Sequence, residues 1–292
     1  MTQPLDDIIG KIDGLPTIPA VSHRVGELIH DPRADARAIA ALLRSDQSLT
    51  AKVLKLANSA YYGIPGGVTD VTRAISFLGF NTLYQLVLSV SVFSVLRGSD
   101  ASTLDIRELW KHSLGCGLLA ERIAAHLGIA DTNVCFTGGL LHDIGKVALL
   151  QVAPARFVEA VALARAKSLS MAAAATECGL PTHVAVGSRL AERWRFPMPL
   201  RVAIAHQRYQ APEARQALAA NLAPFADIAA LANVLCRRFG FGDPGDPVLP
   251  EVDPALLERL NLTTAQIDKL KTELLRAAER SKVMLDLMSS SA

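Results

Sequence analysis

The chain has 292 residues, half of them hydrophobic and 5% aromatic, and its 30 basic and 28 acidic side chains give a formal net charge of +2. That length can bury one large core or two smaller ones, so we expect one or two domains. The balanced charge, without a block of one sign, gives no electrostatic support for a nucleic-acid partner. The abundance of Ala and Leu favours packed helices.

The cysteines and the N-terminus indicate a compartment. Cys116, Cys135, Cys178 and Cys236 are widely scattered and form no CxxC pair. This pattern is typical of free thiols in a reducing cytosol. The first fifteen residues are too acidic and too interrupted for a signal peptide. We therefore predict a cytoplasmic protein.

The uncharged stretch 74–96 is long enough to raise the question of a membrane span. Ser, Gly, Asn, Thr and Gln recur along it, which makes it a poor lipid-facing helix. We interpret it as a helix of a soluble core and expect no membrane contact.

Apolar residues three or four positions apart predict helices along the first hundred residues. Two short helices are separated by LPTIPAV, Asp35 is a candidate N-cap for the next, and Gly79 indicates a break in the last. The residues YYGIPGGV contain a turn. The predicted helices cover 4–15, 22–31, the segment after Asp35, 45–63 and 70–97.

The small, polar stretch 98–105 is the best candidate for a domain boundary. Residues 240–254 contain four prolines and three glycines, which predicts a loop at the edge of a site or over it. Thr263 and Gln266 form a capping-box pattern. Further helices are predicted near 106–127, 133–151, 155–167, 182–195, 199–208, 216–239 and 263–287.

These elements predict an all-α fold with two helical lobes. Residues 1–100 would form the N-terminal lobe, and residues 101–292 the second lobe with a helical C-terminal extension. No strand-like alternation and no internal repeat competes with this interpretation.

The segment GGLLHDIGK, residues 138–146, places His142 and Asp143 side by side at the end of an apolar run. A neutral imidazole and a carboxylate can both ligate one divalent cation. Glu108 and His112 are four residues apart, so a helix would put both on one face. The alternative for Glu108 is a surface salt bridge.

Three more candidates follow on apolar helical faces. His183, His206 and Asp227 each share a face with apolar side chains. A buried charge such as Asp227 requires a metal or a strong hydrogen-bond donor as its partner. Taken singly, each candidate is more often structural than ligating. Their recurrence in one lobe predicts a site for one or two metal ions, and iron, manganese, zinc and magnesium all suit the mixed His and carboxylate set.

The order of these residues resembles the HD superfamily of metal-dependent phosphohydrolases, and more closely its HDOD branch, the HD-related output domain of bacterial signalling proteins. The likeness runs from about residue 10 to 240, and the last fifty residues show no motif of the family. The segments that carry it, in order, are LPTIPAV, DQSLTAKVLKLANSAYYG, TRAISFLGFNTL, LWKHSLG, GLLHDIGK and AERWRFP.

The resemblance implies a metal site formed by Glu108, His112, His142, Asp143, His183, His206 and Asp227. The sequence departs from the HD-GYP phosphodiesterases in having His206-Gln207 where they have two histidines, and in lacking the Gly-Tyr-Pro motif. HDOD domains are generally regarded as regulatory. The resemblance therefore favours a signalling protein that binds metal and acts through protein partners.

Two alternatives remain open at this stage. The chain could be a metal-dependent phosphohydrolase acting on a nucleotide or another phosphoester, with Lys146 contacting the phosphate. Lys146 could equally be a solvated lysine at a helix end. The chain could also be a helical scaffold whose buried histidines bond to carboxylates. The N-terminal segment DQSLTAKVLKLANSAYYG carries four polar side chains that could serve packing, a partner surface or the seam between the lobes, in a regulatory protein or in a scaffold. They are Asn58, Ser59, Tyr61 and Tyr62.

Overall fold

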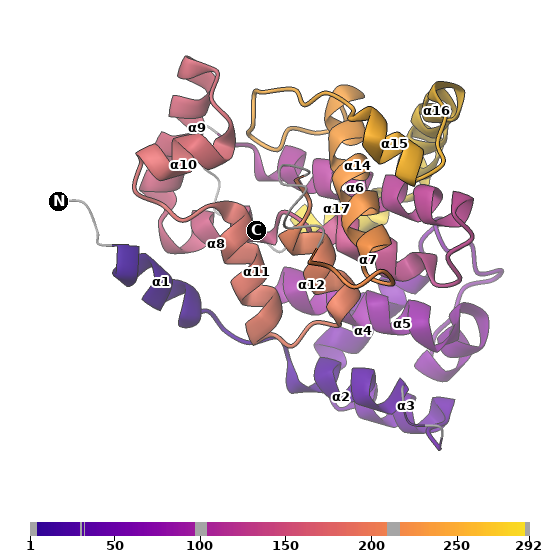
Figure 1. Ribbon diagram of the computed structural model, residues 1–292. Coiled ribbons are helices and arrows are strands. Elements are labelled where there is room, and N and C mark those ends of the chain that lie inside the picture. Colours follow the sequence, from indigo (N-terminus) through magenta and orange to yellow (C-terminus); the bar gives the residue numbers. More distant parts are fainter. Residues whose placement is uncertain (1–4, 30, 32, 97–103, 209–216, 290–292) are drawn as a thin grey trace.

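The computed structural model describes residues 5–29, 31, 33–96, 104–208 and 217–289, and its regular elements are all helices (Figure 1). The predicted all-α class is confirmed. The first five helices are α1 (Leu5–Asp13), α2 (Ala20–Ile29), α3 (Ala36–Arg44), α4 (Gln47–Ala57) and α5 (Val71–Val95).

The helix starts in this part follow the capping rules. Asp35 Oδ1 accepts a hydrogen bond from Ala38 N at 2.8 Å, as its N-cap pattern predicts. Asp46 and Asp70 cap α4 and α5 in the same way. Gly79 adopts a φ of 77° inside α5, which confirms the predicted break, because a left-handed residue interrupts the helical ladder.

Helix α5 is the one element among the described residues with the length and composition to cross a membrane. Within its most apolar 18-residue window, 56% of the residues are buried in the protein. Together with the break at Gly79, this burial is consistent with a helix of the protein core.

The second part begins with α6 (Ile106–His126), which contacts α7 (Thr132–Leu141) and α14 (Ala223–Arg238) extensively. The other helices are α8 (Ile144–Val152), α9 (Pro154–Lys167), α10 (Met171–Glu177), α11 (His183–Arg193), α12 (Met198–Ala205), α15 (Pro254–Arg259), α16 (Thr264–Arg280) and α17 (Lys282–Ser289). Thr263 and Gln266 form the predicted capping box at the start of α16.

Several helix boundaries differ from the prediction. The expected helix 133–151 is two helices that meet at His142 and Asp143, and the expected helix 263–287 is broken at Ser281. The expected helix 216–239 begins at Ala223, and its first residue lies outside the described residues. The apolar pattern does not mark the break at His142 and Asp143, because the residues on both sides of it are buried. Helices α10 and α15 were not predicted.

One continuous hydrophobic core runs from Ile8 to Met284 and so spans both predicted lobes. Helix α1 packs against α8 and α11, while α17 returns to α4 and α6 (Figure 1). Each end of the chain is therefore attached to the opposite half of the molecule.

Tyr61 lies at the seam between the two halves. Its hydroxyl hydrogen-bonds to Glu121 Oε2 of α6 at 2.5 Å, and its ring stacks on Phe136 of α7 with centroids 5.8 Å apart. Asn58 instead bonds to both backbone groups of Val68 and holds the turn after α4. Tyr61 therefore lies at the seam between the lobes, and Asn58 has a packing role in the turn.

Two helix crossings depend on the absence of a side chain. A Cβ at Gly145 of α8 would lie 1.9 Å from the carbonyl oxygen of His183, and one at Gly139 of α7 would lie 2.5 Å from the carbonyl oxygen of Cys116. Both clashes are with backbone, which has no alternative rotamer. Helix α8 therefore meets the start of α11, and α7 meets α6, at backbone distance.

We expect Gly145→Ala to lower the free energy of unfolding by about 3 kcal/mol or more, because the added methyl group must separate α8 from α11. Urea denaturation followed by circular dichroism measures the change. The matched control is Gly10→Ala in α1, where the new Cβ meets nothing within 4 Å. That variant should gain about 0.5 to 1 kcal/mol from helix propensity. Equal stability of Gly145→Ala and wild type would contradict the close crossing.

Candidate metal centre

Four of the predicted ligands come together where three helical segments meet. His112 lies in the middle of α6, His142 and Asp143 form the junction of α7 and α8, and His183 is the first residue of α11. The close crossing at Gly145 brings the start of α11 to that junction. We call these four side chains the His–Asp cluster.

The carboxylate of Asp143 is the centre of the cluster. Its Oδ2 lies 3.3 Å from His142 Nε2 and 4.0 Å from His112 Nε2, and its Oδ1 lies 3.6 Å from His183 Nε2. All four residues are at most 2% exposed. Three imidazoles from different helical segments thus surround one carboxylate away from water.

Lys146 also belongs to this centre. Its Nζ donates a hydrogen bond to Asp143 Oδ2 at 2.6 Å, and the residue is 2% exposed. The interpretation of Lys146 as a solvated residue at a helix end is therefore wrong. The two residues lie three positions apart across the start of α8, so the helical turn directs the lysine back to the carboxylate.

Among the residues that the structure describes, several polar atoms of the cluster find no hydrogen-bond partner. They are His142 Nε2, Asp143 Oδ1 and both ring nitrogens of His183. His142 Nδ1 lies 2.6 Å from the carbonyl oxygen of Gly139, which can only accept a hydrogen bond, so Nδ1 carries the proton and the neutral imidazole has its lone pair on Nε2. Buried polar atoms without partners are costly. The ligand atoms of His112, His142 and Asp143 lie within 4.8 Å of one another, a spacing that could hold a metal ion, and His183 lies beside Asp143.

The other three predicted ligands lie in different surroundings. Glu108 pairs with Lys111 at 3.1 Å on the surface, as its alternative interpretation holds. Asp227 is buried and pairs with Arg259 of α15 at 3.3 Å, so its partner is a strong donor. His206 is only half-buried at the end of α12. The described residues therefore supply a set for one ion, without the further ligands of a second.

Gln207 supports the cluster through the main chain. Its Nε2 donates to the carbonyl oxygen of His142 at 2.6 Å, and its Oε1 accepts from Asn233 of α14 at 3.3 Å. The sequence indicated only that Gln207 is a poorer metal ligand than histidine. The structure shows it as a buried amide that positions the segment carrying His142.

Two buried thiols lie beside His112, a feature the sequence analysis missed. Cys116 Sγ is 3.4 Å from His112 Nε2, and Cys236 Sγ is close enough to complete a possible ligand group with them. All four cysteines are free, as predicted. Burial raises the pKa of the Cys116 thiol well above its usual value, so without a metal the thiol is protonated. The i,i+4 spacing of His112 and Cys116 was the available sequence signal.

The electrostatic environment favours neutral imidazoles and an ionised carboxylate, the protonation states that bind a metal ion. Burial depresses the pKa of His112 and of His183 well below the usual range, so both imidazoles are neutral at pH 7. Burial opposes ionisation of Asp143, but His142, Lys146 and His183 together outweigh it and hold the pKa of that carboxyl well below its usual range. Burial also lowers the pKa of Lys146, although Asp143 opposes this shift.

The comparisons with known proteins identify the family. The HDOD domain model matches residues 15–210, which is more than half of the chain. The chain belongs to the HDOD family. The match contains the whole His–Asp cluster and ends before α14.

A curated protein also matches much of the chain. An uncharacterized protein of Treponema pallidum is 28% identical over 222 residues, which are 74% of this chain and 42% of the relative. The chain thus spans about two fifths of that curated relative.

Solved structures share the fold. An HDOD domain protein of unknown function from Geobacter sulfurreducens is 25% identical with a TM-score of 0.68, covering 98% of this chain and 96% of that one. A protein from Marinobacter aquaeolei, whose name assigns it provisionally to signal transduction, is 23% identical with a TM-score of 0.76. The alignment covers 99% of this chain and 62% of that one.

We expect the protein to lose stability on acidification below about pH 6.5, the usual pKa of unfolded histidine. Because the folded pKa values of His112 and His183 are depressed, the unfolded chain takes up protons that the folded chain does not. Above that pH the free energy of unfolding does not depend on these two histidines. Below it, each of the two lowers the free energy of unfolding by roughly 1.4 kcal/mol per pH unit.

Urea denaturation between pH 7.5 and about pH 5, with a chelator present, measures this slope. His183→Asn should make the slope shallower, because one of the two titrating groups is gone. A wild-type stability that is flat across this range would show that the two imidazoles are not buried in the neutral form.

Proposed function

We propose that this HDOD protein is a regulatory module of a signalling pathway, which binds one divalent metal ion at the His–Asp cluster and acts through protein partners. The observation that carries the proposal is the state of Asp143. Its carboxylate is buried, paired with Lys146 at 2.6 Å and surrounded by three imidazoles. This arrangement suits retention of an ion more than turnover of a substrate.

Hydrolysis of a phosphoester would require an open ligand position for water and a path for the substrate. The side chains of the cluster are at most 2% exposed, which argues against an open approach for a substrate. The surroundings of Glu108, His206 and Asp227 also argue against a second ion. The absence of the Gly-Tyr-Pro motif points in the same direction.

A bound ion would supply a fixed positive charge at the meeting point of α6, the α7–α8 junction and α11. His112, His142, Asp143 and His183 would hold it. Lys146 already supplies one positive charge to Asp143 Oδ2, so lysine and ion would compete for the same carboxylate. Such a competition links metal occupancy to the position of the first turn of α8.

An exposed aromatic pair supports the partner part of the proposal. Phe77 and Phe80 flank the break at Gly79 and are 51% and 36% exposed. Aromatic residues are enriched at protein interfaces, where they bury a large apolar area. We propose this part of α5 as a contact surface for a signalling partner.

The first experiment measures metal content and phosphodiester turnover of the wild type and of Asp143→Ala, each purified with and without oxygen. We expect close to one equivalent of metal in the wild type, loss of that metal in Asp143→Ala, and turnover in neither. Turnover that is lost together with the metal would overturn the regulatory function. A folded wild type without metal under both conditions would leave only a scaffold.

A second experiment concerns the competition at Asp143. Lys146→Met should raise metal affinity about tenfold or more, because the carboxylate then has no other cation. Without metal the same variant should be less stable by about 3 kcal/mol, since it leaves a buried charge unpaired. Isothermal titration with a divalent metal salt and urea denaturation provide the two readouts.

The matched control is Lys111→Met, which breaks the half-exposed pair with Glu108 outside the cluster. It should leave metal affinity unchanged and stability within about 1 kcal/mol. Equal metal affinity in Lys146→Met and the wild type would show that the lysine and the ion do not share Asp143.

A further inference from the structure

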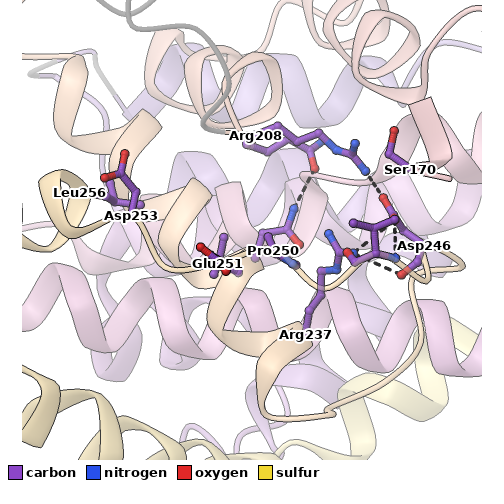
Figure 2. Close-up of a pocket in the computed structure, with 12 residues that line it drawn as sticks. Ser170, Arg208, Arg237, Asp246, Pro250, Glu251, Asp253 and Leu256 are labelled. Atoms are coloured by element: carbon purple, nitrogen blue, oxygen red, sulfur yellow. Dashed lines mark hydrogen bonds and ion pairs between the residues drawn. The ribbon is translucent and has the colours of Figure 1, made fainter. Parts of the chain in front are cut away.

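A cavity of about 200 Å³ is lined by Gln207, whose side chain donates to the carbonyl oxygen of His142. Its other walls come from α14, from Arg208 after α12, and from residues 246–253 of the segment 240–254, which the sequence predicted as a loop at the edge of a site or over it (Figure 2). Ser170 and Leu256 complete the lining. Most of these walls lie beyond the residues that match the HDOD family.

One end of the cavity carries excess positive charge. Arg208 and Arg237 both form ion pairs with Asp246, so two guanidinium groups share one carboxylate (Figure 2). The side chain of Arg237 is 8% exposed and that of Asp246 is 2% exposed. A buried, incompletely neutralised pair of arginines is a site for a carboxylate or phosphate group.

Polar atoms without partners also mark this cavity. Arg237 Nε and Asn233 Oδ1 are buried and make no hydrogen bond within the described part of the chain. Both residues line the cavity. Their unmet hydrogen bonds show that the protein around Arg237 and Asn233 satisfies them incompletely, and a ligand in the cavity would contact other atoms of these two residues.

The rest of the lining has a different character. Val234, Val248, Pro250 and Leu256 provide apolar walls. Asp253 lies across the cavity from Ser170 and Asp246 (Figure 2), and its carboxylate already accepts a hydrogen bond from Ala255 N at 2.9 Å. In Figure 2 Arg208, Arg237 and Asp246 lie toward one end of the cavity, and Asp253 and Leu256 lie at the other end. Pro250 and Glu251 lie between the two ends, so carboxylates and apolar groups share the wall away from the arginines.

A purely structural role explains only part of this arrangement. Arg237 donates to the carbonyl oxygens of Asp246 and Val248, and Arg238 donates to that of Pro250, so the arginines hold the segment 240–253 in place. That role accounts for the pairing with Asp246. It does not explain why a second arginine, Arg208, shares the same carboxylate, or why a cavity remains between the walls.

We propose that this cavity binds a small organic acid, with its carboxylate or phosphate at Arg208 and Arg237, its apolar body against Val234 and Leu256, and a hydrogen-bond donor toward Glu251 and Asp253. The volume sets the size, since a cavity of about 150 Å³ holds benzene. The ligand is therefore a single-ring or amino-acid-sized molecule. A dinucleotide does not fit inside.

The position of Gln207 gives the site a consequence for the cluster. Gln207 lines the cavity and donates to the carbonyl oxygen of His142 at 2.6 Å, while Asn233 bonds to its side chain from α14. A molecule seated against Gln207 and Asn233 therefore touches the residue that positions His142. The binding site itself does not depend on whether the cluster holds metal.

The test uses 4-aminobenzoate as the probe, because it carries a carboxylate, a flat apolar ring and an amine at the far end. Isothermal titration and saturation-transfer NMR on the full chain should show binding at one site in the millimolar range or tighter. The neutral isostere 4-aminobenzamide should bind about tenfold more weakly, which corresponds to about 1.4 kcal/mol. No binding of 4-aminobenzoate at millimolar concentration, or equal affinity for the amide, overturns the proposal.

Two variants locate the probe. Val234→Phe should fill the cavity and abolish binding, and Arg208→Gln should weaken it about tenfold or more. The control is Arg201→Gln, which breaks a surface pair with Glu192 and should leave affinity unchanged. Circular dichroism and thermal unfolding establish whether each variant is folded. If Arg208→Gln does not fold, Val234→Phe alone tests whether the probe binds in the cavity. Unchanged binding in folded Val234→Phe would place the probe elsewhere and overturn the proposal.

Discussion

The buried carboxylate of Asp143 is the constraint on which the second half of the molecule depends. A lone charge in this position would be strongly destabilising, so every neighbouring element contributes a partner to it. His112 arrives from α6, His142 from the end of α7, Lys146 from α8 and His183 from α11. The mutual positions of these helices are thus fixed by electrostatics as well as by apolar packing.

Small residues make that arrangement possible. Gly139 and Gly145 flank the His142–Asp143 junction and let its two helices approach α6 and α11 at backbone distance. Larger residues would move α6 and α11 away, and their imidazoles could not reach one carboxylate. The GGLLHDIGK segment is therefore a packing motif as much as a ligand motif, because its glycines and its ligands serve the same junction.

Gln207 connects this junction to the rest of the C-terminal half. Where the HD-GYP phosphodiesterases carry a histidine, this chain has an amide that bonds to the main chain of His142 and to Asn233. Through these two bonds Gln207 links the His–Asp cluster to the polar cavity lined by Arg208 and Arg237. The proposed ion site and the proposed small-ligand site therefore adjoin each other, which suits the regulatory function that we propose.

The sequence by itself determined the helical class, the Asp35 cap, the break at Gly79 and the capping box at Thr263. Local patterns suffice for these, because capping and helical periodicity act within a few residues. The sequence grouped seven candidate ligands without distinguishing the four that the structure brings together. Tertiary structure alone decided that α7 and α8 are separate, that Lys146 is buried and that Asp227 pairs with Arg259. Those outcomes depend on contacts between residues far apart in the chain, where an apolar pattern shows that a residue is buried but not which partner it meets.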